Sequence, residues 1–215
     1  MESAPRLPVP VFPLPNVVLF PHAIVPLHVF ELRYRTLVRD ALAGERVLAL
    51  ALLKPGFERD YFGSPEFHDL GCLARFEAVE WLPDDCYDLT LLGLGRVRLG
   101  PPVREYPYRA ARAEPLPEAP YSEEDPLVAS ERRALLELYR RLSGRPGHAP
   151  EAWAAGEGVP FAALVNGVCM AAPLEAAEKL ELLALDSVIE RGHLARELIV
   201  RRLREAAGGS EGQQN

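Results

Sequence analysis

The chain has 215 residues, of which 48% are hydrophobic and 26% charged, a balance typical of folded globular proteins and unlike that of disordered chains. Its formal net charge is −7 and no basic block occurs, so we expect no nucleic-acid partner, because a polyphosphate backbone requires a concentrated cationic surface. The sequence contains neither an apolar run of about 20 residues nor the pattern of a secretion signal. We therefore expect a cytoplasmic protein without a membrane partner.

Three cysteines, Cys72, Cys86 and Cys169, lie far apart and form neither a CxxC pair nor a Cys/His group with zinc spacing. Because their number is odd and free cysteine is commonly buried and inert, we expect unpaired thiols in a reducing compartment. The five histidines show no HExxH or HxH arrangement. The sequence therefore predicts no metal and no cofactor.

Short apolar runs separated by prolines open the chain. Residues 9–14 and 17–20 suit edge strands and bends, because proline cannot donate to a sheet ladder. Residues 23–30 predict a further strand with alternating apolar side chains. From Glu31 the apolar residues recur at helical spacing, and Gly44 is expected to end this helix in a left-handed conformation.

The next part of the chain is predicted to form strands around a loop. Residues 46–53 are apolar on both faces, which favours a buried strand, although so short a run also fits a helix. Residues 54–70 are expected to form a long loop, since glycine and proline punctuate them. Residues 71–82 and 87–99 predict a hairpin across a tight turn, and residues 106–116 predict a last strand.

Helical spacing replaces strand alternation after the proline-rich joint at residues 115–120. Ser122 and Asp125 predict the start of the first helix, which is expected to end before a flexible connection at residues 144–159. The predicted apolar stripe of this helix comprises Leu127, Leu135, Leu138, Tyr139 and Leu142.

Three further helices are predicted in the remaining part of the chain. Pro160 and Pro173 suit the first turns of two of them, because the missing N–H of proline is not needed there. Ser187 followed by Glu190 predicts a capping box for the last helix.

The sequence therefore predicts an α+β protein with two parts. Residues 1–120 are expected to form a β pseudo-barrel of about six strands with one inserted helix. Residues 121–207 are expected to form an α-helical bundle, and residues 208–215 a disordered tail.

No motif for catalysis or phosphate binding stands out. Gly93, Gly95 and Gly100 have the look of a phosphate loop, but the sequence continues as strand rather than helix, and no GxxxxGK[ST] motif occurs. We interpret these glycines as marks of a bulge or a close backbone approach in a curved sheet. Neither GxSxG nor SxxK is present, so we expect a protein that is not an enzyme.

The most informative surface candidate is the 54–70 loop, because it carries four aromatic residues. Exposed aromatic groups on a loop are a common basis for protein recognition. The same residues could instead fold back as a lid over the core, and the sequence leaves both interpretations open. The candidate protein-binding residues are Phe57, Tyr61, Phe62 and Phe67.

Several short motifs resemble the N-terminal domain of Lon proteases. The opening block is fairly specific, and weaker blocks follow in the strand order of that family. The motifs are Pro13-Leu14, Leu19-Phe20-Pro21, Pro26-Leu27-His28-Val29-Phe30-Glu31, Arg33-Tyr34, Gly71-Cys72-Leu73-Ala74, Gly93 with Arg96-Val97, and Tyr108-Arg109-Ala110. The resemblance implies a pseudo-barrel related to PUA-like barrels, followed by a helical bundle.

In full-length Lon proteases, the similar domain engages substrates and supports oligomer formation ahead of an ATPase domain and a Ser-Lys protease domain. Neither catalytic domain has a counterpart in these 215 residues. The resemblance therefore implies a non-catalytic, proteolysis-associated module that binds proteins or unfolded peptide segments. Two alternatives remain: an adaptor or regulator that docks on a full-length ATP-dependent protease through the helical part, and an enzyme whose site is assembled only by the fold.

Overall fold

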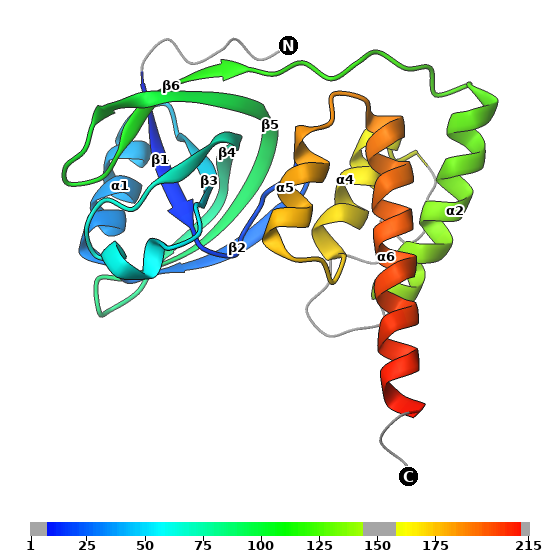
Figure 1. Cartoon of the computed structure of the whole chain (residues 1–215). Coiled ribbons are helices and arrows are strands. Elements are labelled where there is room, and N and C mark those ends of the chain that lie inside the picture. The colour runs from blue at the N-terminus through cyan, green and yellow to red at the C-terminus, as the bar shows by residue number, and fades with distance from the viewer. Residues whose placement is uncertain (1–7, 144–157, 212–215) are drawn as a thin grey trace. The chain divides into compact units, whose positions relative to one another are not determined.

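The structure is a computed structural model that describes residues 8–143 and 158–211. The chain divides into two compact units, Met1–Pro117 and Glu118–Asn215 (Figure 1). Strands dominate the first unit, and the described part of the second unit is helical. The chain therefore has the α+β fold that its sequence predicts.

The first unit is a mixed sheet with two helical insertions. Helix α1 comprises Leu32–Ala43, and the short 3₁₀ helix η1 comprises Phe57–Asp60. Within the described residues the six strands are β1 (Val9–Leu14), β2 (Ile24–Val29), β3 (Val47–Leu53), β4 (Phe67–Trp81), β5 (Tyr87–Arg104) and β6 (Ala110–Pro115).

The sheet curls because β5 is long enough to pair with three other strands (Figure 1). The strand order is β2-β5-β4-β3-β1-β6, and β6 pairs again with β5. Strand β2 pairs with residues 87–92 of β5, whereas β6 pairs with residues 97–104. Only two residue pairs join β1 to β6, so the sheet is a pseudo-barrel that does not close as a regular barrel.

A close backbone approach explains Gly93, as the sequence predicts. A Cβ atom at Gly93 would lie 2.1 Å from the carbonyl oxygen of Phe20. The register between β4 and β5 shifts between Leu73 and Ala74, which pair with Gly95 and Gly93. The buried residues of the core cluster beneath this curved sheet are Val9, Val11, Ala49, Ala51, Val97, Leu99 and Ala111.

Two strand predictions need correction. Residues 17–20 form no strand, although three of them are buried, so their apolar character reflects core packing without sheet pairing. The last strand begins at Ala110 rather than at residue 106, because residues 105–109 form a bend in which Pro107 cannot donate to a ladder. The buried strand at residues 46–53 and the β4–β5 hairpin are confirmed.

The predicted end of helix α1 is right in position and wrong in conformation. Gly44 has φ −103° and ψ −133°, which is not left-handed, and its N–H donates to the carbonyl oxygens of Asp40 and Ala41. The left-handed residue is Arg46, with φ 58°, whose N–H donates to Ala41 O at 3.0 Å. The chain therefore reverses two residues later than the glycine suggests.

The described part of the second unit contains four helices, the number predicted. They are α2 (Pro126–Ser143), α4 (Phe161–Ala171), α5 (Ala176–Ala184) and α6 (Val188–Glu211). None of the helices in the described ranges has the length and apolar character needed to cross a bilayer.

The starts of these helices match the sequence signals only in part. Helix α2 begins where predicted, with the Asp125 carboxylate accepting from Leu127 N at 2.8 Å. Helix α6 also starts as predicted, since Ser187 Oγ accepts from Glu190 N at 3.2 Å. Pro160 lies at the N-cap of α4, one residue before the expected position.

The prediction for Pro173 is wrong, because α5 begins three residues later. Glu175 and Glu178 form a capping box there, which satisfies backbone N–H groups more fully than a first-turn proline would. Leu127 is a second correction, since its side chain is 66% exposed and lies outside the apolar stripe. Leu135, Leu138 and Tyr139 of that stripe are buried. The side chain of Leu142 and the connection at residues 144–157 lie outside the described residues.

The end of the chain differs from the expected disordered tail over its first part. Helix α6 continues to Glu211, four residues into the 208–215 segment, and residues 212–215 lie outside the described ranges.

A buried arginine organises the second unit. Arg191 is fully buried and donates to Glu118 Oε1 at 2.6 Å and to Asn166 Oδ1 at 2.7 Å. It also donates to the carbonyl oxygens of Leu182 and Leu185, at 3.1 and 2.6 Å. The Arg191 side chain therefore joins α6 to three other parts of the second unit. These are the segment before α2, which carries Glu118, helix α4, and the end of α5. This role was not predicted from the sequence, because arginine side chains are charged and are usually exposed.

Candidate functional site

The segment between β3 and β4, residues 54–66, forms the aromatic loop. Its two ends are joined where Lys54 N donates to Glu66 O at 2.9 Å, and η1 occupies its middle. A salt bridge of 2.8 Å between the Lys54 and Glu66 side chains reinforces this closure. The two ends of the loop are therefore held together where the loop joins β3 and β4.

Arg33, near the start of α1, holds the tip of the aromatic loop. Its guanidinium donates to Tyr61 O at 2.7 Å and to Gly63 O at 2.8 Å. Glu31 accepts from Arg33 Nε at 3.0 Å and from the Tyr61 hydroxyl at 3.2 Å. Burial, and then the Glu31 carboxylate, raises the pKa of Tyr61, so this hydroxyl stays a donor at neutral pH. The tip is therefore fixed by charge-assisted hydrogen bonds.

Arg109 holds the other end of the loop. It is 7% exposed, donates to Pro65 O, and places its guanidinium carbon 4.8 Å from the ring centroid of Phe67. Burial lowers the pKa of Arg109, although a guanidinium stays charged at any physiological pH. Arg33 thus joins the loop tip to the start of α1, and Arg109 joins the end of the loop to the bend before β6.

The four predicted aromatic residues take different positions in this arrangement. Phe62 is 88% exposed, whereas Phe57 and Tyr61 are half-buried and Phe67 is half-buried in β4. The Tyr61 ring lies 5.3 Å from Phe62 and 6.2 Å from Phe57, centroid to centroid, so these three form a small cluster. The loop is therefore neither a lid nor wholly exposed: Tyr61 supports Phe62, and Phe62 projects outward.

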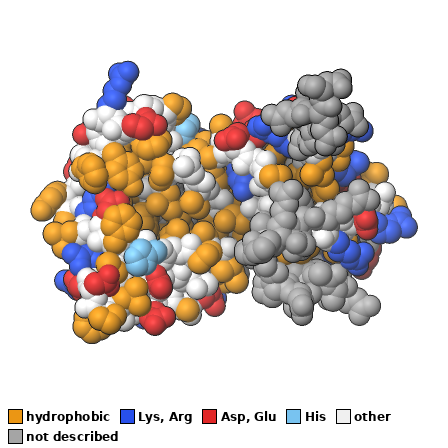
Figure 2. Space-filling view, turned by 90° about the horizontal axis from the view of Figure 1, so that it is seen from below, with side chains coloured by type: hydrophobic (Ala, Val, Ile, Leu, Met, Phe, Trp, Pro, Cys, Tyr) orange, Lys and Arg blue, Asp and Glu red, His pale blue; other side chains and the backbone are white. Residues whose placement is uncertain are grey.

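Two further exposed apolar residues precede and follow Glu31 in the sequence. Phe30 is 62% exposed and Leu32 is 68% exposed, and both flank Glu31, which bonds to Tyr61. We call Phe30, Leu32 and Phe62 the apolar surface. Figure 2 shows that many hydrophobic side chains are exposed on the side of the first unit that lies at the bottom of Figure 1.

Sequence reasoning missed Phe30 and Leu32, although both carry a signal. Phe30 continues the outward-facing positions of β2, because Val25 and Val29 alternate inward. Leu32 lies on the opposite side of α1 from the buried stripe of Tyr34, Leu37, Val38 and Ala41. An apolar residue off the buried face was therefore visible in the pattern.

A cavity of about 660 Å³ lies beside the base of the aromatic loop. Its apolar wall comprises Phe67, Leu99, Pro101 and Pro102, with Gly100 between them. Its polar lining comprises Lys54, Ser64, Glu66, Asp69, Glu105 and Arg109. We call this hollow the loop cavity.

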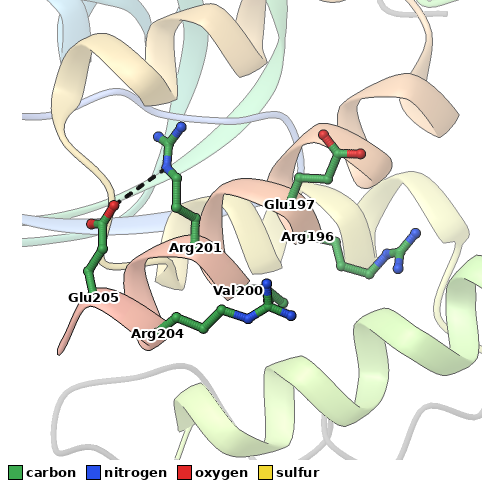
Figure 3. Close-up of a pocket in the computed structure, with 6 residues that line it drawn as sticks. All are labelled: Arg196, Glu197, Val200, Arg201, Arg204 and Glu205. Carbon is green, nitrogen blue, oxygen red and sulfur yellow. Dashed lines mark ion pairs between the residues drawn. The ribbon is translucent and has the colours of Figure 1, made fainter. Parts of the chain in front are cut away.

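Two other hollows are weaker candidates. One, of about 360 Å³, is lined among the described residues by α6 alone (Figure 3). There Arg201 and Glu205 turn toward each other at 4.0 Å, while Arg196 and Arg204 point away from them. A second hollow, of about 440 Å³, lies over β2, β4 and β5 near the 2.7 Å contact between His28 and Asp88. A groove on one helix has no second wall to enclose a ligand.

The cysteines and the possible metal ligands bear on the question of catalysis. The three cysteines are buried, as predicted, and none of them forms a disulfide bond; burial raises the pKa of the Cys169 thiol to about 12. In residues 8–143 and 158–211, no group of three or more His, Cys, Asp or Glu side chains could hold a metal ion. The arrangement of the described residues fits a surface that contacts a partner better than it fits a catalytic site.

Residues 8–201 match the family model described as the ATP-dependent protease La (LON) substrate-binding domain. Among curated proteins, Lon protease 2 of Sorangium cellulosum is 37% identical over 111 residues, 52% of this chain. The Lon protease of Koribacter versatilis is 29% identical over 213 residues, 94% of this chain. The chain covers only 14% and 26% of the lengths of these two relatives.

Two solved structures share the fold. The N-terminal domain of the Mycobacterium avium complex Lon protease aligns with a TM-score of 0.66 at 21% identity, covering 89% of this chain and 97% of that one. A Lon N-terminal domain protein from Xanthomonas campestris aligns with a TM-score of 0.56 at 25% identity, covering 86% of this chain and 94% of that one.

Proposed function

Since the chain belongs to the family of the ATP-dependent protease La (LON) substrate-binding domain, we propose that it is a non-catalytic module that binds proteins or unfolded peptide segments. The observation that carries this proposal is the apolar surface, in which Phe30, Leu32 and Phe62 are each more than 60% exposed. Exposed apolar groups that gather on one face commonly mark a site of protein contact.

The contacts around Arg33 support this proposal. Binding an unfolded segment costs conformational entropy, and a receptor that is already ordered adds less to that cost. Arg33 and Glu31 hold the loop tip through backbone and side-chain bonds, so Phe62 is presented by an ordered support. Burial of the three side chains by a partner would then contribute about 25 cal/mol per Å² of apolar area.

A binding measurement tests the apolar surface directly. The probe is a fluorescently labelled protein kept unfolded by reduction and alkylation of its cysteines, and the readout is fluorescence anisotropy. We expect the double substitution Leu32→Ser/Phe62→Ser to weaken binding at least about tenfold, because two central apolar contacts are lost. The matched control is Leu127→Ser, which removes an equally exposed leucine from α2 in the other unit.

The outcomes separate the hypotheses. Equal affinity of the double variant and the unsubstituted chain would overturn the proposal. A loss of binding confined to Leu127→Ser would instead favour the adaptor hypothesis, in which the helical unit docks on a protease.

The module is also expected to release no phosphate from ATP and to leave the labelled probe uncleaved. We further propose that binding takes place in the cytoplasm, which is supported by the absence of a disulfide bond at Cys72, Cys86 and Cys169.

A further inference from the structure

We propose that the loop cavity receives a lysine or arginine side chain of the bound polypeptide. The module would then prefer segments that combine apolar residues with a basic residue. This inference rests on the proposed function, because it assumes that the ligand is a polypeptide. It adds a charge preference to the apolar recognition described above.

The shape of the loop cavity suits a long side chain with an apolar stem. Phe67, Leu99, Pro101 and Pro102 provide an apolar wall, and the volume is about 660 Å³. Lysine and arginine bury their methylene groups along such surfaces while the charged head stays near water. The cavity opens beside the base of the same loop that carries Phe62, so a single segment can engage both sites.

The charges of the cavity favour a cation. Its lining carries three carboxylates, on Glu66, Asp69 and Glu105, against two cations, on Lys54 and Arg109. Lys54 is paired with Glu66 at 2.8 Å, and this hydrogen bond lowers the pKa of Glu66. That pair therefore adds no net charge to the cavity.

The remaining charges leave Asp69 unbalanced. The positive charge of Arg109 is offset by nearby Glu105, and its guanidinium is already occupied by Pro65 O and the Phe67 ring. Glu105 also accepts from Ser64 Oγ at 2.9 Å. Asp69 is exposed, and no side chain in the described part of the chain pairs with it. An incoming cation would be its counter-ion, whereas a carboxylate would be repelled.

A set of three peptides tests the preference. They share length and apolar residues and differ at one central position, which is Lys, Gln or Glu. Affinities are measured by fluorescence anisotropy at low salt. We expect the Lys peptide to bind about two- to fivefold more tightly than the Gln peptide, the range typical of one exposed ion pair, and the Glu peptide to bind most weakly. High salt should reduce the difference.

Substitution of Asp69 locates the effect. In Asp69→Asn the Lys-over-Gln ratio should fall to about one with the Gln peptide unaffected, and Asp69→Lys should reverse the order. The matched control is Glu45→Gln, which removes one exposed negative charge outside the cavity. Circular dichroism confirms that each variant is folded.

Two results would overturn the inference: equal binding of the Lys and Gln peptides, or an unchanged ratio in Asp69→Asn. Failure of the proposed function looks different. In that case none of the three peptides binds, or each peptide binds Leu32→Ser/Phe62→Ser as tightly as it binds the unsubstituted chain.

Discussion

Glycine at position 93 is required by the space around it rather than by its backbone angles. An added methyl group at Gly93 would meet the Phe20 carbonyl oxygen at 2.1 Å and the Cys72 sulfur at 3.2 Å. The obstacle is mainly backbone, which cannot move aside cheaply. Gly95, two residues away, has nothing within 4 Å of the same position.

We therefore expect Gly93→Ala to lower the free energy of unfolding by about 1–3 kcal/mol, the usual cost of overpacking a core. Gly95→Ala is the matched control and should change it by less than about 0.5 kcal/mol. Urea denaturation followed by circular dichroism measures both. A similar stability of the two variants would contradict the close approach at Gly93.

The roles of some single residues could be predicted from the sequence, and those of others could not. The glycine was recognisable because an isolated glycine in a strand indicates a bulge or a close contact. The roles of Arg33 and Arg191 were not recognisable, because their partners are mostly carbonyl oxygens and side chains that lie far away in the sequence. No local pattern specifies such partners.

At the scale of elements, one carboxylate joins the start of α4 to the segment before α2. Glu123 Oε1 accepts from Phe161 N at 2.8 Å and from the Tyr121 hydroxyl at 3.1 Å, and Oε2 binds Arg132. Partial burial acts to raise the pKa of Glu123, but these hydrogen bonds outweigh it and leave the pKa lowered. A negative charge at this helix N-terminus is also favoured by the helix dipole.

This lowered pKa predicts an acid-sensitive contribution to stability. Because the folded state holds Glu123 ionised to lower pH than the unfolded state does, its contribution is present above about pH 4.5 and is lost as the pH falls through the folded-state pKa. We expect Glu123→Gln to be destabilised at pH 7, and we expect its difference in stability from the unsubstituted chain to shrink as the pH falls below about 4.5. Urea unfolding at several pH values measures this.

Glu124→Gln is the control for that experiment, since it removes a neighbouring exposed carboxylate. Its stability should follow the pH dependence of the unsubstituted chain. If Glu123→Gln loses the same stability at pH 3 as at pH 7, the charge of Glu123 is not what stabilises the start of α4.

Helices and strands in which apolar residues recur at regular spacing could be predicted from the sequence. The residues at which they begin and end were harder to predict. Strands β2, β4 and β5 and all four helices of the second unit follow from alternation or helical spacing. Strand β3 follows from an apolar run of strand length, which also fitted a helix. Errors arose at prolines: residues 17–20 are buried without pairing, and α5 begins at a glutamate capping box beyond Pro173. Proline indicates that regular structure is interrupted, but the residue at which it resumes depends on which N–H groups find partners.

At the scale of the whole molecule, each of the two compact units contains deeply buried leucines. Leu50 is 2% exposed in β3, and Leu135 is fully buried in α2. We propose that the units open independently, in keeping with the boundary near residue 120 that the sequence suggests. Each leucine then reports on its own unit.

We expect Leu50→Ala and Leu135→Ala each to destabilise its own unit by about 2–5 kcal/mol, the usual cost of such a truncation. Hydrogen exchange measured segment by segment should show faster exchange in β1, β3 and β4 for the first variant and in α2, α4 and α6 for the second. Faster exchange across both units in either variant would show that they unfold as one.

The class, the order of strands and helices, the family resemblance and the aromatic loop as a candidate site could all be predicted from the sequence. These follow from local period, turn residues and short motifs, which are properties of neighbouring residues. The contacts by which Arg33 and Arg109 hold the loop, and the outward position of Phe62 beside Tyr61, became clear from the tertiary structure alone. The loop cavity likewise joins residues from the loop, β4, β5 and the bend after it. Exposure and pairing of this kind depend on which distant segments meet, and no local pattern encodes that.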